Sequence, residues 1–287
     1  MLESRLLKLP AGFGRVITEL AKRQILAVIP ARYYSSRLPG KPLLQIGSRT
    51  MLERVYARVR RSQLVTRIAV ATDDDRIFEA ARALGAEVYS TDPGHTSGTE
   101  RVAEVAARLP EASIVVNVQG DEPFIEPEAI DQAIRPILEK AGAPVSTLKT
   151  ALTSPEQAAD PNVVKVVTDR AGRALYFSRA CLPFVRDHTD RTHVTYHKHL
   201  GIYVFERKFL LRFPALPRGP LEALEKLEQL RVLENGYSIQ VVETAYDSVG
   251  VDTEEDLAQA RLRARNEGEN INQQHSPLVT QGAEENA

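Results

Sequence analysis

The chain has 287 residues, of which 43% are hydrophobic and 26% are charged, and its formal net charge is −1. This composition is typical of a folded globular protein, and the balanced charge gives no general attraction to nucleic acid or to a membrane, so neither is expected as a partner. The single cysteine, Cys181, excludes an intrachain disulfide framework and a cysteine-based zinc site, and it suits a reducing cytoplasm.

The two ends of the chain are expected to lie outside the folded domain. Residues 1–23 contain an apolar stretch that is too short and too interrupted for a secretory signal, so we interpret them as an N-terminal extension or as residues upstream of the true start. Residues 266–287 are polar and aperiodic, which predicts a disordered tail. The residues between them, 24–265, contain no low-complexity linker and are predicted to form one domain.

The first part of this domain alternates apolar, β-branched runs with helical patterns. Buried strands are predicted at 25–29, 67–72, 86–91 and 113–119, with amphipathic helices at about 49–61, 75–85 and 99–109. Such alternation is typical of βαβ units, whose strands pair in a mostly parallel sheet with helices on both faces.

The pattern changes in the middle of the chain. Four strand-like pieces, at 143–152, 162–169, 174–180 and 199–206, are joined by polar or proline-bearing loops. They predict an inserted β element that forms a small sub-domain or the edge of a lid. Cys181 follows the third piece and is predicted to pack as a small hydrophobic residue.

The C-terminal part returns to helical patterns. Leucines recur at every third position from Leu221 to Leu233, and we predict one helix that ends at Gly236. Its apolar stripe is expected to make core or dimer contacts rather than a cofactor site. A last strand at 238–244 and a last helix within 250–267 complete the pattern.

Three cations stand in the loop that follows the first strand. Arg32, Arg37 and Lys41 lie in a segment rich in serine, proline and glycine, where they repel one another unless a polyanion lies among them. A triphosphate fits, because guanidinium and ammonium groups make charge-assisted hydrogen bonds to phosphate oxygens. The alternative is a solvated basic loop; the position directly after a strand favours an anion site.

Two acids are placed to hold a cation. Asp121 directly follows the strand at 113–119, and Gly120 beside it permits a ligand to approach closely; the alternative is a turn residue. Asp252 precedes the last helix, where Thr253 and Asp256 also match a capping box. If both carboxylates converge on one Mg²⁺, they complete a phosphoryl-transfer site with the basic loop.

Other polar residues are candidates for nucleotide contacts. Thr72 and Asp73 follow the second strand, while Ser97, Gly98 and Thr99 stand at a predicted helix start. The functional interpretation is recognition of the base or ribose; the structural one is a helix N-cap at Thr99.

Later polar residues are candidates for contacts with a second substrate. His197 and His199 share one face of a strand, but neither a third histidine at a suitable spacing nor a thiolate supports a zinc site. Substrate contacts or structural hydrogen bonds are therefore expected. Arg179 can bind a carboxylate through two hydrogen bonds. Glu228 and Gln229 lie beside the leucine stripe, where a solvated helix face is the alternative.

Together the motifs resemble one family. The segments IPARYYSSRLPGKP, HTSGTERVAEV, VVNVQGDEP, HKHLGIY and LEQLRVLE occur in the order seen in 3-deoxy-manno-octulosonate (Kdo) cytidylyltransferases, and the similarity covers about residues 24–265. The resemblance implies a nucleotide-diphospho-sugar transferase-like fold, a Rossmann-like mixed, mostly parallel sheet with helices on both faces and a small inserted β sub-domain. It also implies a cytoplasmic homodimer that needs Mg²⁺ and transfers CMP from CTP to Kdo, for lipopolysaccharide biosynthesis.

The resemblance also implies roles for individual residues. Nucleotide-binding roles are implied for Ala31, Arg32, Arg37, Lys41, Thr72, Asp73, Ser97, Gly98 and Thr99. Sugar-acid contacts are implied for Gln119, Arg179, His199, Tyr203, Glu228 and Gln229. Asp121 and Asp252 are implied as Mg²⁺ ligands, and these two acids with Arg32 and Lys41 are the implied catalytic residues.

Two alternatives accompany this interpretation. One is a cytidylyltransferase for a related acid, such as 8-amino-Kdo or a sialic acid. The other is a regulator on the same fold that binds a nucleotide or sugar without catalysis; the presence of both acids argues against it.

Overall fold

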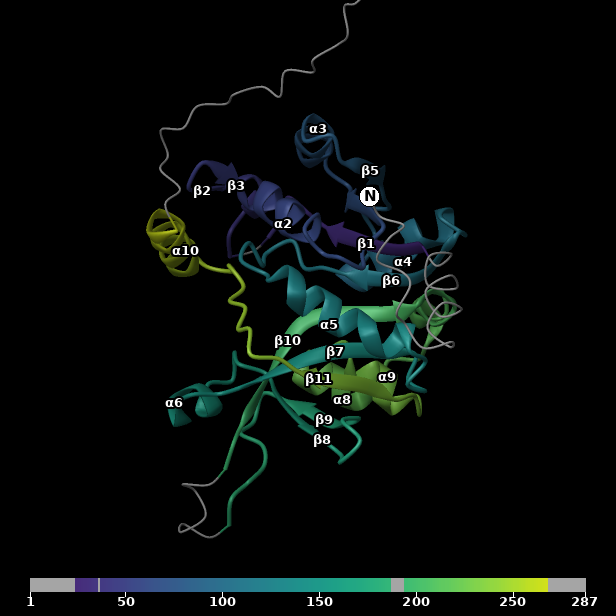
Figure 1. The fold of residues 1–287 in the computed structure, drawn as a ribbon, viewed down its shortest axis with the longest axis vertical. Coiled ribbons are helices and arrows are strands. Elements are labelled where there is room, and N and C mark those ends of the chain that lie inside the picture. The colour runs from purple at the N-terminus through teal and green to yellow at the C-terminus, as the bar shows by residue number, and fades with distance from the viewer. Residues whose placement is uncertain (1–23, 36, 187–193, 268–287) are drawn as a thin grey trace, which may run out of the picture.

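The computed structural model describes residues 24–35, 37–186 and 194–267 (Figure 1). The predicted extension at 1–23 and nearly all of the predicted tail at 266–287 lie outside the described residues. Within the described part of the chain, no helix is long and apolar enough to cross a membrane.

One large mixed sheet organises the described part of the chain. Its main strand order is β11-β7-β10-β6-β1-β4-β5, and a hairpin of β8 and β9 joins it at β10 (Figure 1). Along the main order only β10 runs antiparallel to its neighbours. The strands are β1 (Gln24–Pro30), β4 (Arg67–Thr72), β5 (Glu87–Ser90), β6 (Ala112–Asn117), β7 (Val145–Ala151), β8 (Lys165–Thr168), β9 (Ala174–Ser178), β10 (His197–Glu206) and β11 (Ile239–Glu243), with a separate small pair, β2 (Gln45–Ile46) and β3 (Arg49–Thr50).

Helices cover both faces of this sheet. One apolar cluster joins one face to α2, α3 and α5, and a second joins the opposite face to α4, α7 and α9. A third, smaller cluster packs α10 against the segment that follows β1. The helices are α2 (Met51–Val59), α3 (Asp75–Ala83), α4 (Gly98–Arg108), α5 (Pro127–Leu138), α6 (Pro155–Ala159), α7 (Arg207–Leu210), α8 (Pro220–Glu225), α9 (Leu230–Glu234) and α10 (Glu254–Asn266), with single 3₁₀ turns η2 (Lys41–Leu43) and η4 (Phe213–Ala215).

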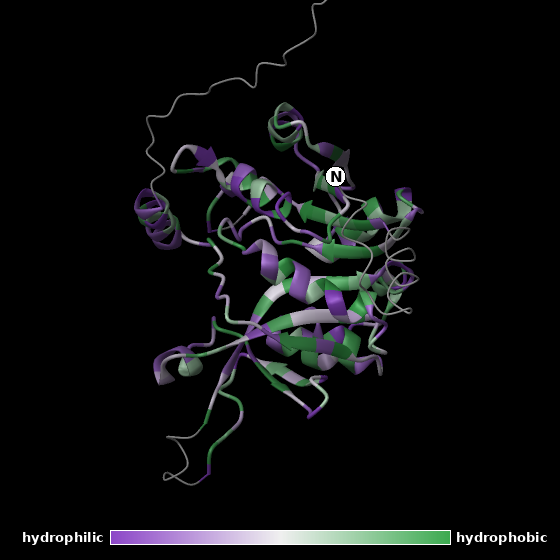
Figure 2. Cartoon of the chain, in the orientation of Figure 1, coloured by the Kyte–Doolittle hydropathy of each residue, from purple (hydrophilic) through white to green (hydrophobic). Residues whose placement is uncertain are grey.

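The sequence explains this layering directly. Residues 25–29 of β1 are all buried, as a central strand covered on both faces requires, and the hydropathy colouring shows the same apolar character in the strands beside it (Figure 2). The predicted mixed, mostly parallel sheet with helices on both faces is confirmed. The predicted capping box of Thr253 and Asp256 also forms at the start of α10.

The leucine-rich segment is not one helix, so that prediction is wrong. α8 ends at Glu225, Lys226 takes a left-handed conformation with φ 53°, and α9 starts at Leu230. Leucines three residues apart rotate by about 60° at each step around a helix of 3.6 residues per turn, so they make no continuous stripe. The break leaves the Leu224 side chain 79% exposed while Leu230 is buried.

The prediction for Cys181 is also wrong. The residue is exposed rather than packed as a small hydrophobic side chain. It lies beyond Ser178, the last buried residue of β9, where the chain has already left the sheet.

Candidate active site

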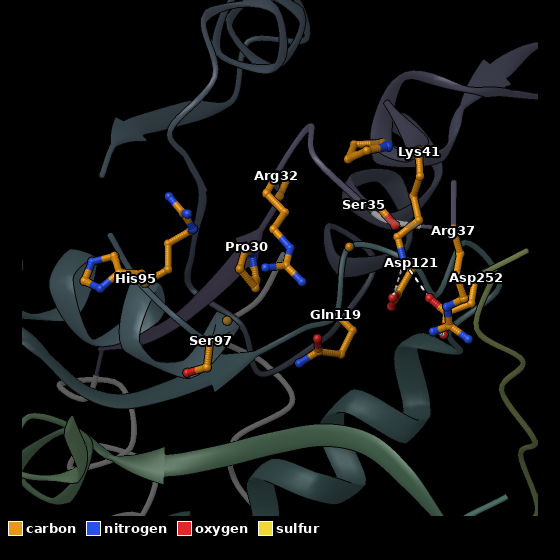
Figure 3. Close-up of a pocket in the computed structure, with 15 residues that line it drawn as sticks. Pro30, Arg32, Ser35, Arg37, Lys41, His95, Ser97, Gln119, Asp121 and Asp252 are labelled. Atoms are coloured by element: carbon orange, nitrogen blue, oxygen red, sulfur yellow. Dashed lines mark hydrogen bonds and ion pairs between the residues drawn. The ribbon is translucent and has the colours of Figure 1, made fainter. Parts of the chain in front are cut away.

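A polar cavity opens beyond the carboxyl ends of β1 and β6 (Figure 3). Its volume is about 250 Å³. This edge is where open α/β sheets bind ligands, because the loops after parallel strands meet there. We call it the first cavity; it is lined by Pro30, Ala31, Arg32, Ser35, Arg37, Lys41, Pro42, His95, Ser97, Gly98, Arg101, Gln119, Gly120, Asp121 and Asp252.

The centre of the first cavity is a small ionic cluster. The Lys41 Nζ atom donates to Asp121 Oδ2 at 2.7 Å and to Asp252 Oδ1 at 2.9 Å, and Arg37 Nη2 donates to Asp252 Oδ2 at 2.8 Å (Figure 3). These residues come from the loop and 3₁₀ turn after β1, from the end of β6 and from the start of α10. The fold therefore joins two acids and two cations that are up to 215 residues apart in sequence.

The electrostatics keep this cluster charged. Burial by itself lowers the pKa of Lys41, but the charges and hydrogen bonds of Asp121 and Asp252 outweigh it and raise the pKa above its usual value. Burial likewise opposes ionisation of Asp252, yet Lys41 and Arg37 hold the pKa of that carboxyl below its usual range. Near neutral pH the site thus presents full charges of both signs.

Close backbone packing brings the two acids together. A Cβ atom on Gly120 would lie 2.8 Å from the Pro30 carbonyl oxygen, so only glycine permits the ends of β1 and β6 to approach this closely. The Val251 N–H then donates to the Asp121 carbonyl at 2.9 Å, which places Asp252 beside Asp121.

The two carboxylates fit a magnesium ion. Both reach the single Lys41 Nζ atom, so they can also reach one small cation between them. Carboxylate oxygens are the ligands that Mg²⁺ prefers, and it commonly takes only one or two from the protein. Among the described residues, no group of three or more His, Cys, Asp or Glu side chains is arranged to hold a metal by itself.

The predicted nucleotide residues separate into two groups. Ala31, Arg32, Arg37, Lys41, Ser97 and Gly98 line the first cavity. Thr72 and Asp73 are absent from its lining: Thr72 is buried and accepts the Asp74 N–H, and Asp73 pairs with Arg101 at 3.2 Å.

Thr99 also lies outside the first cavity. The N-cap of α4 is Ser97, whose side chain accepts the Glu100 N–H, rather than Thr99 as the structural interpretation had it. Thr99 instead donates its hydroxyl proton to Glu228 Oε2 at 2.5 Å, which turns it toward the sugar-side residues.

A second cavity of about 800 Å³ adjoins the first and shares Arg37 and Asp252 with it. Arg179 and His199, two of the predicted sugar-acid contacts, line this second cavity together with Glu122, Lys198 and Ser248. Its walls come from β10, from the loop before β8, from the end of β9 and from the segment between β11 and α10.

His199 is a neutral residue in this wall. Burial lowers its pKa to about 3, and the positive charge of Lys198 adds to the effect. Its Nε2 lies 2.9 Å from the Thr147 hydroxyl oxygen, and that hydroxyl has backbone carbonyls of Leu200 and Ile202 within donating distance. Thr147 thus fixes the position of the neutral His199 ring through its Nε2 atom.

The remaining sugar-acid candidates lie elsewhere. Tyr203, Glu228 and Gln229 line a narrow apolar cleft together with Thr99, and Gln119 lies in the first cavity. Burial raises the pKa of Glu228 despite hydrogen bonds from Ser97 and Thr99, and it raises that of Tyr203 well above its usual value. The Oε1 atom of Glu228 is buried and has no hydrogen-bond partner among the described residues.

The structure adds lining residues that the sequence did not single out as binding groups. Ser35 and His95 line the first cavity, and Glu122, Lys198 and Ser248 line the second; Arg101, a candidate for base or ribose recognition in the sequence, also lines the first. Burial, reinforced by the charge of Asp121, raises the pKa of Glu122 to about 7, against the hydrogen bond from Ser248. The sequence could have indicated Glu122 as a lining residue, because it stands next to Asp121 after a buried strand. It could not have indicated Ser248, which stands in an irregular segment.

Comparisons with known proteins point in one direction. A family model described as cytidylyltransferase matches residues 26–241. Relatives named 3-deoxy-manno-octulosonate cytidylyltransferase include one from Solibacter usitatus, 54% identical over 82% of this chain and 92% of the relative. Another, from Syntrophotalea carbinolica, is 51% identical over 84% of this chain and 98% of the relative.

Solved structures agree with these relatives. A CMP:2-keto-3-deoxy-manno-octonic acid synthetase in complex with CTP matches with a TM-score of 0.81 and 40% identity, over 85% of this chain and 99% of that one. A 4-diphosphocytidyl-2C-methyl-D-erythritol synthase from Anaerococcus prevotii matches with a TM-score of 0.58 over 85% of this chain and 99% of its own, but at 17% identity it supports the fold alone.

Proposed function

The chain belongs to the 3-deoxy-manno-octulosonate cytidylyltransferase family, and we propose that it transfers CMP from CTP to the anomeric 2-hydroxyl of Kdo, with release of pyrophosphate. The observation that carries this proposal is the cluster of Lys41 and Arg37 with Asp121 and Asp252 at the carboxyl ends of β1 and β6. It offers cations for a triphosphate and carboxylates for a metal in one place.

The basic loop is suited to bind the triphosphate. Arg32 lines the first cavity, and Arg37 and Lys41 reach the same cavity through ion pairs with the two acids (Figure 3). When phosphates enter, these cations exchange carboxylate oxygens for phosphate oxygens at little cost, because both partners are anionic and partly solvated. The same cations stabilise the charge that develops on the departing pyrophosphate.

Asp121 and Asp252 are the proposed ligands of Mg²⁺. When bound, the ion supplies positive charge that polarises the phosphoryl oxygens and offsets the charge of the triphosphate. The protein residues do the rest by position: they hold the α-phosphorus where the sugar hydroxyl attacks in line, so no covalent nucleophile is required.

The second cavity is suited to the sugar acid. It adjoins the first cavity at Arg37 and Asp252, so a sugar held there faces the triphosphate. Arg179 and Lys198 provide positive charge for the Kdo carboxylate, and neutral His199 offers a ring nitrogen for a hydrogen bond with a hydroxyl group. Gln119, Tyr203, Glu228 and Gln229 remain predicted contacts for the part of the substrate nearest β6 and α9.

We also propose that the enzyme is a cytoplasmic homodimer that serves lipopolysaccharide biosynthesis. The use of CTP supports the compartment, and the family supports the pathway. For the dimer, large apolar side chains of Leu175, Phe184 and Leu224 are exposed around β9 and α8, and such surface is typical of interaction sites. Sedimentation of the purified protein tests the assembly: a monomer at micromolar concentration contradicts it.

The function is tested by pyrophosphate release from CTP with Kdo, 8-amino-Kdo or a sialic acid as acceptor. We expect Kdo to be the preferred acceptor by kcat/KM. Preference for another acid would reassign the substrate, and ligand binding without turnover of any acid would favour the regulator.

A further inference from the structure

Lys165, at the start of β8, has a fully buried side chain, and this burial lowers the pKa of its amino group below the usual value. Its Nζ atom donates to three backbone carbonyl oxygens: those of Asp160 at 2.7 Å, Val163 at 2.6 Å and Arg179 at 2.7 Å. A buried ammonium is costly unless its donors are satisfied, and here three donors meet three acceptors. The group is therefore a connector between segments of backbone.

The segments that Lys165 connects are walls of the second cavity. Asp160 and Val163 bound the loop before β8, and Arg179 directly follows β9; all three line that cavity, whereas Lys165 does not. The neighbouring β10 wall is fixed to the same hairpin, because the His199 N–H donates to the Val164 carbonyl at 2.8 Å. One side chain thus holds two walls of the cavity together from behind.

The orientation of the Arg179 side chain depends on this arrangement. Its Nη1 donates to the Pro161 carbonyl at 3.0 Å, and its Nε donates to the Glu225 carbonyl at 2.8 Å. Pro161 belongs to the loop that Lys165 holds, and Lys165 also holds the Arg179 backbone. Lys165 therefore helps to place both the Arg179 backbone and the loop that its Nη1 contacts, while Glu225 holds its Nε.

We propose that Lys165 is a positioning residue for the sugar acid. It fixes the 160–163 loop and Arg179 in the geometry that binds this substrate, without touching it. The proposal rests on the proposed function, since it assigns the second cavity to the sugar acid. The nucleotide, which is held from the first cavity, is bound independently of Lys165.

The test is Lys165→Met, which keeps the apolar stem and removes the three donors. We expect the KM for Kdo to rise about tenfold or more, because three carbonyls lose their partners and the cavity wall relaxes. The KM for CTP should stay within about twofold of wild type, and kcat at saturating Kdo should be largely retained.

Lys149→Met is the matched control. Lys149 lies on β7, is partly buried, and donates to the Thr168 hydroxyl at 3.3 Å, but it does not line the second cavity. This variant should change neither KM. If Lys165→Met does not fold by circular dichroism, Lys165→Gln, which keeps an amide donor, should show the same separation of the two KM values at a smaller size.

The outcomes separate the two proposals. An unchanged KM for Kdo in a folded Lys165 variant, or equal rises in both KM values, overturns the positioning role while wild-type turnover of Kdo upholds the function. If the wild type uses another sugar acid, the KM values are measured with that acid. A wild type that turns over no sugar acid overturns the proposed function, and the positioning role with it.

Discussion

The two halves of the sheet treat polar groups in opposite ways. On the side of β1, β4 and β6, charged side chains meet one another at an open cavity: the side chains of Lys41, Asp121 and Asp252 are 15%, 28% and 43% exposed. On the side of β7, β8 and β10, Lys165 and His199 are buried and bonded to the protein. The first half holds charges that can exchange partners, whereas the second holds groups whose partners are fixed.

The two halves should therefore respond differently to substitutions. In the first half, a substitution should change chemistry and leave the fold intact, because solvent replaces the lost partner. In the second half, a substitution should change stability or the shape of a cavity, because buried polar groups are left without their hydrogen-bond partners. The variants below test this division, in order of expected effect.

Asp121→Asn should have the largest effect and should act on chemistry alone. The amide keeps the shape but loses the charge that faces Lys41 and the proposed Mg²⁺, so kcat/KM should fall by about 100- to 1000-fold. Steady-state pyrophosphate release measures it. Asp169→Asn, which alters a partly exposed acid paired with Arg173 on the β8–β9 turn, is the control and should remain active. A large drop in the thermal stability of Asp121→Asn would contradict the claim that substitutions in the first half leave the fold intact.

His199→Gln should change how the unfolding free energy depends on pH. The folded pKa of His199 is about 3, below the ordinary 6.5, so the unfolded chain binds a proton that the folded chain does not. The contribution of His199 to stability is therefore complete above pH 6.5 and is lost as pH falls toward 3. Between pH 6.5 and 5, wild type should lose about 2 kcal/mol of unfolding free energy more than the variant. Urea unfolding at both pH values measures this, and parallel pH dependences would contradict it.

Ser248→Ala should have an intermediate effect at the boundary between the halves. The Ser248 hydroxyl donates to the buried Glu122 Oε2 at 2.9 Å, and this bond ties the segment before Asp252 to the end of β6. Its loss should lower the unfolding free energy by about 1 kcal/mol. Because Val251 still bonds to the Asp121 carbonyl, kcat/KM should fall only a few-fold. Chemical denaturation and kinetics on one preparation give both values; activity lost as fully as in Asp121→Asn would place Ser248 in the chemistry.

Cys181→Ser should have the smallest effect. Cys181 is exposed beyond the end of β9, so the substitution should change the unfolding free energy by less than about 0.5 kcal/mol. The wild-type thiol should react with a thiol reagent in the native protein at the rate of an accessible cysteine. A slow reaction would instead support the sequence prediction that Cys181 is packed.

The sequence predicted the first half better than the second. The basic loop and Asp121 each stand directly after a buried strand, and the rule that ligands bind at such ends brings them together without any knowledge of side-chain contacts. Asp252 stands beside a capping signal at Thr253; the capping box forms, and Asp252 also reaches the ionic cluster through Lys41.

The failures have local causes. Asp73 pairs with Arg101 rather than lining the first cavity itself, and nothing in the sequence indicates that pairing, so its nucleotide contact stays a prediction. The spacing of the leucines predicted one helix. The segment instead forms two short helices, which the ion pair of Arg231 with Glu222 joins across the break at Lys226. Lys165 gave no signal because a lysine in a strand is usually solvated, and only the arrangement of three carbonyls explains its burial.

The attachment of the β8–β9 hairpin has a consequence for how the protein opens. Its strand register with β10 contains one residue pair, Lys165 with Lys198, and single backbone bonds tie it to β10 at Val164 and to β11 at Gly172, whereas β1 pairs along its length with β4 and β6. In native-state hydrogen exchange, amides of the hairpin should therefore exchange through a local opening while those of β1 wait for global unfolding. A bound sugar acid should slow exchange in the hairpin first, because the residues that flank β8 and β9 form walls of the second cavity.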